Sequence, residues 1–193
     1  DALTGKSGPL SASLLNKDTD YLEEVDKHKN IQVRCIYQVI KIQAFIFAGE
    51  YKEALLLSEK TKTPLYTVGT KGLLPWPEFL FSRFIILTSL YNGETDQQKK
   101  AYLEELKTIH AQLKRWAKFC PENYKFKLRL TEAELERIGG KHEKAFPLYD
   151  QAIRSAAEGK FLQWEALANE KAATFWINSG NTHVAFNYWR QSY

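Results

Sequence analysis

Four histidines are the first residues of this sequence that could bind a metal ion or transfer protons. They lie far apart, with no His-Glu-x-x-His pattern and no pair four residues apart, so zinc-dependent hydrolysis has no template here. Two of them stand just past glycine turns, where helices begin. We therefore predict no metal site and no cofactor. The four residues are His28, His110, His142 and His183.

Two short glycine-lysine segments resemble parts of a phosphate-binding loop. Gly5-Lys6-Ser7 would need an earlier glycine before Asp1 and an apolar strand upstream, and Gly8-Pro9 would interrupt the helix that must follow. A linker over residues 1–16 is the simpler interpretation. Gly139-Gly140-Lys141 matches only in composition, and a helix–helix turn explains both glycines by their tolerance of positive φ.

The remaining candidates for chemistry are two cysteines and a group of carboxylates. Cys35 falls in an apolar helical pattern and Cys120 at the end of another, so both are expected to be core or boundary residues. Glu132, Glu134 and Glu136 alternate along one helix and cannot share a face as a catalytic pair. We find no catalytic constellation and predict that this segment is not an enzyme.

Composition points to a folded protein of the cytoplasm. The chain has 193 residues, 44% of them hydrophobic and 26% charged, with a net charge of +4 that is too mild for a specific nucleic-acid role. Two unpaired cysteines favour a reducing compartment, and neither a spanning apolar run nor a secretion signal is visible. The absence of Met suggests an excised segment or a processed product.

The elements that would position any site are helical hairpins. In the last third of the chain, an apolar periodic segment meets a glycine turn twice, at Gly140 and at Gly180, and an alanine follows five residues later each time. A small residue also lies seven positions before each glycine, and an aromatic residue nine positions after it. These offsets match tetratricopeptide packing sites, where small residues let paired helices approach. The matching residues are Ala133, Ala145, Tyr149, Ala173, Ala185 and Trp189.

Earlier parts of the chain continue the same periodicity. Apolar residues at steps of three and four predict helices, and an apolar stretch on all sides predicts the most buried one at 78–91. Thr95 or Asp96 is expected to cap the helix that ends near Phe119, and prolines and glycines predict a long loop at 63–77. The predicted helices cover 18–29, 31–48, a return helix from Glu50, 78–91 and 95–119.

Turn glycines set the repeat length. Gly49, Gly93, Gly140 and Gly180 follow one another at intervals of 44, 47 and 40 residues, longer than a typical tetratricopeptide unit. We predict an all-α, tetratricopeptide-like superhelix of about four antiparallel hairpins with elongated helices, forming one domain over residues 17–193. Since the chain stops inside the last return helix, its apolar end is expected to face a missing neighbour, and self-association through that helix is a further expectation.

Several segments together resemble the middle of very large signalling proteins. They are Tyr21–Glu24, Phe47–Leu55, Trp116–Tyr124 (WAKFCPENY), Glu132–Lys141, Tyr149–Ile153 and Glu165–Glu170. In that family a serine/threonine kinase-like domain precedes a P-loop ATPase domain, a tetratricopeptide-like region, a GAF domain and usually a histidine kinase. The resemblance covers roughly residues 20–193 and implies a sensing or partner-binding arm for the ATPase. It carries over no catalytic residue.

A protein-binding role follows as the leading hypothesis. The concave face of such an array would bind a peptide, a protein or neighbouring domains of the parent chain, with no membrane contact. Two alternatives stay open: a helical enzyme acting on nucleotides or phosphoryl groups, and a nucleic-acid-binding array using the rings and charges of residues 124–129. The repeat frame places five candidate partner-binding residues on the concave face: Lys127, Glu134, Arg137, Glu170 and Thr174.

Overall fold

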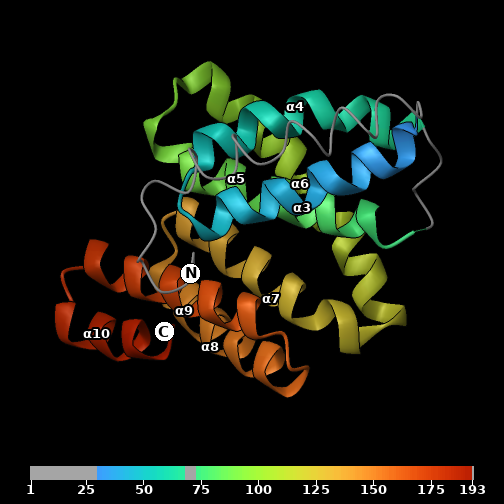
Figure 1. Cartoon of the computed structure of the whole chain (residues 1–193). Helices are drawn as coiled ribbons and strands as arrows, with labels where there is room; N and C mark the ends of the chain where they lie inside the picture. The colour runs from blue at the N-terminus through green and yellow to red at the C-terminus, as the bar shows by residue number, and fades with distance from the viewer. Residues whose placement is uncertain (1–29, 68–72, 193) are drawn as a thin grey trace. The chain divides into compact units, whose positions relative to one another are not determined.

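The structure is a computed structural model that describes residues 30–67 and 73–192. Within those ranges the chain forms eight α-helices and one short 3-10 helix, and no strand (Figure 1). The predicted all-α helical-repeat fold is therefore confirmed. The chain divides into two compact units that meet between Leu90 and Tyr91. The prediction of one continuous domain over 17–193 stays a prediction, and the linker at 1–16 and the helix at 18–29 lie outside the described residues.

Within residues 30–67 and 73–90, the described part of the first unit, lie three helices, each in contact with the other two. Asn30 caps the first of them, since its Oδ1 accepts a hydrogen bond from the Val33 amide at 3.1 Å. Side chains at helical spacing, such as Val39, Ile42 and Ile46, are buried, so the β-branched content does not prevent a helix here. The helices are α3 (Ile31–Phe47), α4 (Tyr51–Thr67) and α5 (Pro75–Leu90).

The prediction of a long loop over 63–77 is wrong at both ends, because helices extend into this range from either side. Helix α4 continues through Pro64 to Thr67, although a proline inside a helix costs roughly 3 kcal/mol. The extra turn buries Leu65 completely, which contributes about 1.5–3 kcal/mol and offsets most of that cost. At the other end, Pro75 begins α5, where its fixed φ suits the first helical turn. The prediction that this helix is the most buried one is confirmed.

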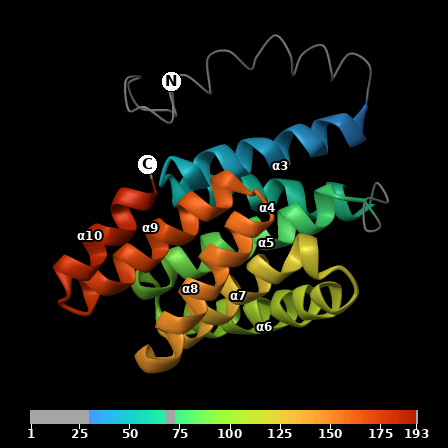
Figure 2. The same cartoon turned by 90° about the horizontal axis from the view of Figure 1, so that it is seen from below.

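The second unit is a run of antiparallel helices in which each contacts the next along the chain. Thr95 caps the first long helix by accepting a hydrogen bond from the Gln98 amide, and that helix ends at Phe119 as predicted. In the views of Figures 1 and 2 the last helix lies beside its predecessor at the margin of this unit. The elements are η3 (Tyr91–Gly93), α6 (Asp96–Phe119), α7 (Pro121–Ile138), α8 (His142–Glu158), α9 (Leu162–Asn178) and α10 (Thr182–Gln191).

Small residues are buried in the last two hairpins of the second unit. Ala133 and Ala145 on the α7–α8 hairpin and Ala173 and Ala185 on the α9–α10 hairpin are all buried. A larger side chain at any of them would push the helix axes apart. The burial of the four alanines that the glycine and alanine offsets predict is confirmed. No helix within residues 30–67 and 73–192 is both long and apolar enough to cross a membrane.

One turn geometry closes four of the helix–helix connections. In each, a residue with positive φ follows the helix, and the next residue donates its amide hydrogen to the carbonyl five positions back. Glycine takes the positive-φ place three times, and Lys160 takes it between α8 and α9 with φ of 58°. Gly93 differs, because it belongs to a 3-10 helix. At the Gly139-Gly140 turn, where positive φ was expected at both glycines, Gly139 has a negative φ and only Gly140 has a positive one. The four bonds are Glu50 to Phe45, Lys141 to Glu136, Phe161 to Ala156 and Asn181 to Trp176.

Lys160 is the residue to replace in order to stabilise the fold. A side chain with a Cβ is strained at positive φ, so Lys160→Gly is expected to raise the free energy of unfolding by about 0.5–1 kcal/mol. Urea unfolding followed by circular dichroism measures the change. Lys141→Gly is the matched control, because Lys141 sits in the equivalent connection with φ of −96° and should give no gain. Equal effects of the two changes would contradict this explanation.

Candidate functional site

A buried group of charged and polar side chains connects α7, α8 and α9. We call Glu134, Arg137, Tyr149 and Lys171 the Glu134 cluster. Arg137 donates two hydrogen bonds to the Glu134 carboxylate, from Nε at 3.2 Å and from a terminal nitrogen at 2.7 Å. The Tyr149 hydroxyl donates to the same carboxylate from α8. Glu134 is 1% exposed, so water does not compete for these bonds.

Electrostatics keep the cluster in one charge state. Burial alone would raise the pKa of Glu134, but the charge and hydrogen bonds of Arg137, the charge of Lys171 and the Tyr149 hydroxyl lower it to about 2. Burial, together with the negative charge of Glu134, raises the pKa of Tyr149 well above its usual range. A carboxylate that already accepts three hydrogen bonds is a poor base, and a tyrosine held neutral is a poor nucleophile. The cluster is suited to fixing helices in register.

The five candidate partner-binding residues do not form one exposed face. Lys127 and Glu134 are buried, which corrects the expectation that their charged ends face a partner. The Lys127 ammonium lies 5.7 Å from the Tyr124 ring centroid and 5.5 Å from that of Phe126, so these rings hold its stem inside the unit. Partner binding by Arg137, Glu170 and Thr174 stays a prediction.

Arg137 also lines a small pocket of about 150 Å³ beside the cluster. His142 and Phe175 contribute to its wall, and their rings lie 5.3 Å apart. The imidazole Nδ1 of His142 lies 3.3 Å from the Ser179 hydroxyl, which anchors the start of α8 to the end of α9. A pocket of this size holds a few water molecules and is smaller than typical ligand pockets of about 300 Å³ or more.

Glu170 and Thr174 belong to a different surface, on the α9–α10 hairpin. Steps of four and three residues place Glu170, Thr174 and Ile177 along one side of α9, and a step of three does the same for Phe186 and Trp189 on α10. Neighbouring positions of the same hairpin meet α8 through a ring contact of Phe175 with Tyr149 and a 2.7 Å hydrogen bond from the Tyr188 hydroxyl to Asp150. We call these five residues the open face.

Three of the five residues of the open face have large, solvent-exposed apolar side chains. Phe186 is 59% exposed, Trp189 44% and Ile177 36%. Adjoining exposed apolar residues of this size are typical of protein interaction sites, whereas scattered ones are not. The sequence pattern pointed to Trp189 as a packing aromatic and did not single out Ile177 or Phe186. Their positions relative to Gly180 are the signal that could have found them, because the same positions before and after Gly140 hold Arg137 and Phe146.

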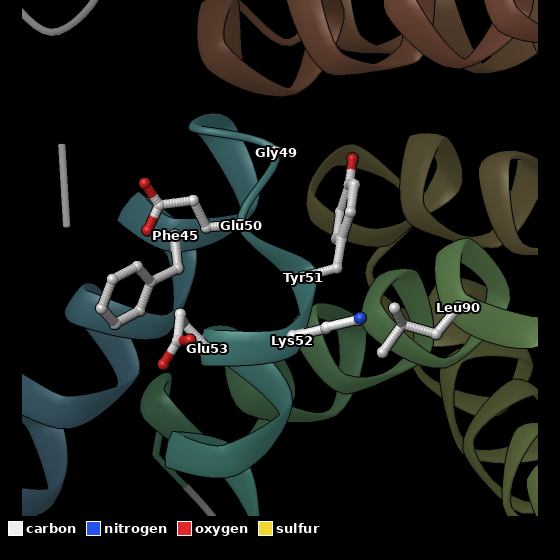
Figure 3. Close-up of a pocket in the computed structure, with 7 residues that line it drawn as sticks. All are labelled: Phe45, Gly49, Glu50, Tyr51, Lys52, Glu53 and Leu90. Carbon is white, nitrogen blue, oxygen red and sulfur yellow. The ribbon is translucent and has the colours of Figure 1, made fainter. Parts of the chain in front are cut away.

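A larger hollow of about 580 Å³ lies at the α3–α4 turn of the first unit. Figure 3 shows Phe45, Glu50 and Glu53 on one side of it and Tyr51 and Lys52 on the other. The acidic and basic groups alternate along one short segment, and Glu53 and Lys52 are exposed to solvent. This arrangement offers no single ligand chemistry, and we assign no site to it.

Cys35, Cys120 and His110 occupy structural positions. Burial raises the pKa of the Cys35 thiol, which keeps it protonated and a weak nucleophile. The Asn123 side-chain amide donates to the Cys120 sulfur at 3.2 Å. Burial lowers the pKa of His110, whose Nδ1 lies 3.4 Å from the Thr131 hydroxyl. His28 lies outside the described residues. In the described part of the chain, no three potential metal ligands of the His, Cys, Asp or Glu type come together.

Neither family models, nor curated proteins, nor solved structures provide a match to this chain.

Proposed function

We propose that this chain is a non-catalytic helical-repeat module that binds protein. The open face carries the proposal. Three large apolar side chains, Ile177, Phe186 and Trp189, are exposed on a hairpin that also packs against α8, and such a surface gains free energy when a partner covers it.

The arrangement of charges supports a binding role over a chemical one. Two ionisable groups of the second unit with strongly shifted pKa values, Glu134 and Tyr149, are joined by a hydrogen bond between two helices. Perturbed pKa values mark catalytic groups when those groups line a substrate cleft, and structural networks perturb pKa values as well. Glu134 and Tyr149 are fully enclosed, which favours the structural interpretation.

The setting of the module is the second part of the proposal. In it, the chain works in the cytoplasm beside the kinase and ATPase domains of a signalling protein, and binding at the module biases their activity. The resemblance of Trp116–Tyr124 and of the segments after it to the helical region of such proteins supports this setting. It is the reason to look for the partner among components of a signalling pathway.

Site-specific photo-crosslinking tests the binding role. The photoreactive residue benzoylphenylalanine replaces Phe186 in the cell that makes this protein, and irradiation is expected to join the chain covalently to a partner. Phe119 is the matched control position, because it is 76% exposed on α6 in the same unit and lies outside the open face. Adducts from position 186 that do not exceed those from position 119 would refute the proposed function.

A further inference from the structure

The two hairpins of the second unit repeat each other at an interval of 40 residues. Backbone hydrogen bonds at the two turns correspond to each other. The bond from the Lys141 amide to the Glu136 carbonyl corresponds to that from Asn181 to Trp176, and the bond from Ala145 to Lys141 corresponds to that from Ala185 to Asn181. Each residue of the α9–α10 hairpin therefore has a counterpart on the α7–α8 hairpin. On this basis Tyr149 corresponds to Trp189, and Phe146 to Phe186.

The α7–α8 hairpin shows how such a face is covered, because α9 lies against it. The Phe175 ring of α9 packs at 5.5 Å from Tyr149, and Trp176 packs at 5.8 Å from Phe146. As a result Tyr149 is 1% exposed, whereas its counterpart Trp189 is 44% exposed. The internal repeat thus supplies the geometry of a helix that would cover the open face.

Charge adds a second requirement. On the covered hairpin, Lys171 of α9 brings a positive charge to the Glu134 carboxylate of α7. The open face also carries a carboxylate, that of Glu170. It lies one helical turn before Thr174, and Thr174 is the residue that corresponds to Glu134. Burial already raises the pKa of Glu170, so a cation brought close to it would stabilise the charged form. A long basic side chain spans one turn of helix, about 5.4 Å.

We propose that the open face binds an amphipathic α-helix of a partner protein, which lies along α10 as α9 lies along α8. An aromatic residue of this helix packs on Trp189 and Phe186, and a basic residue one turn away pairs with Glu170. A length like that of α9, which has 17 residues, covers the face. This inference rests on the proposed function and narrows the partner to a helix of that chemistry.

Helix α9 itself provides the probe. It carries Lys171 and Phe175 four residues apart, the combination that the open face is inferred to select. A fluorescein-labelled peptide with the sequence of residues 161–178 is titrated with the full chain, and fluorescence anisotropy reports binding. Saturable binding is expected, and Trp189→Ala and Phe186→Ala should each weaken it at least about tenfold, the effect of losing a central aromatic contact. Phe119→Ala is the matched control and should leave the affinity unchanged.

A charge exchange separates direct pairing from loss of fold. Glu170→Lys in the protein should weaken binding of the peptide, and a peptide carrying Lys171→Glu should bind that variant better than it binds the original protein. The absence of saturable binding, an equal effect of Phe119→Ala and Trp189→Ala, or no recovery in the exchanged pair would each overturn the inference.

Two further outcomes would show that something other than a partner helix covers the open face. A dimer in sedimentation that dissociates with Trp189→Ala and with added peptide would show that a second copy of the chain covers the face, and would overturn the choice of a separate partner. Crosslinking from position 186 without peptide binding would overturn the helix inference and leave the proposed function intact. Failure of both experiments would remove both.

Discussion

Replacing Glu134 by alanine is expected to lower the free energy of unfolding by about 3–5 kcal/mol. The change leaves the Arg137 guanidinium, whose side chain is only 17% exposed, without its carboxylate partner. It also removes the acceptor of the buried Tyr149 hydroxyl. Chemical denaturation followed by far-UV circular dichroism measures the loss.

A less buried pair of the same type provides the control for this prediction. Arg129 and Glu132 are also three residues apart on α7 and approach to 2.6 Å, but their side chains are 34% and 23% exposed. Because this pair is more exposed than Glu134 and Arg137, Glu132→Ala should cost less than Glu134→Ala. Joint replacement of Glu134 and Arg137 by leucine should recover the part of the loss that comes from the uncompensated Arg137 charge, because it removes both charges together. Similar losses in the free energy of unfolding for Glu134→Ala and Glu132→Ala would contradict the claim that burial makes the Glu134 pair the more important one.

Acid is expected to remove the same stabilisation. The pKa of Glu134 is about 2 in the folded chain, against 4.5 for a glutamate without these interactions, as in the unfolded chain. The folded state therefore binds this proton less readily than the unfolded state. A lowered pKa contributes stability that is complete above the unfolded value and is lost as the pH falls through the folded value. The shift corresponds to about 3 kcal/mol, lost between about pH 4.5 and about pH 2.

The comparison that isolates this titration is with Glu134→Gln, which cannot ionise. Both proteins lose stability in acid through their other carboxylates, so the free energies of unfolding are measured across the pH range and subtracted. The difference should favour the original protein near neutral pH and shrink as the pH falls toward about 2. Parallel curves for the two proteins would contradict the assigned pKa.

Helix boundaries set by local chemistry were predictable from the sequence. Gly49, Gly140 and Gly180 end helices because they accept positive φ, and Thr95 begins one because its hydroxyl can accept a backbone hydrogen bond. These effects act within a few residues and need no knowledge of the rest of the fold. The alanine positions followed from the same repeat, and the structure confirms their burial.

Features that depend on distant residues were not predictable in this way. Pro64 stays inside a helix because the turn beyond it buries Leu65, and no local rule anticipates that gain. Glu134 and Lys127 have the polarity of surface residues, yet Tyr149 from the next helix and two neighbouring rings allow them to be buried. The candidate site was predicted in part: Glu170 and Thr174 lie on the open face, whose apolar members Ile177 and Phe186 the charge pattern could not reveal.

The recurring turn has a consequence for how such a chain can grow. At Gly49, Gly140 and Gly180 a Cβ atom would meet nothing within 4 Å, so glycine is favoured at these residues by the positive φ of the backbone and not by contacts with other helices. A stretch of DNA encoding one complete hairpin, cut at equivalent points of two such turns, would bring its own means of reversal when copied in tandem or deleted. Unequal recombination between hairpins would then change the number of repeats in a single step.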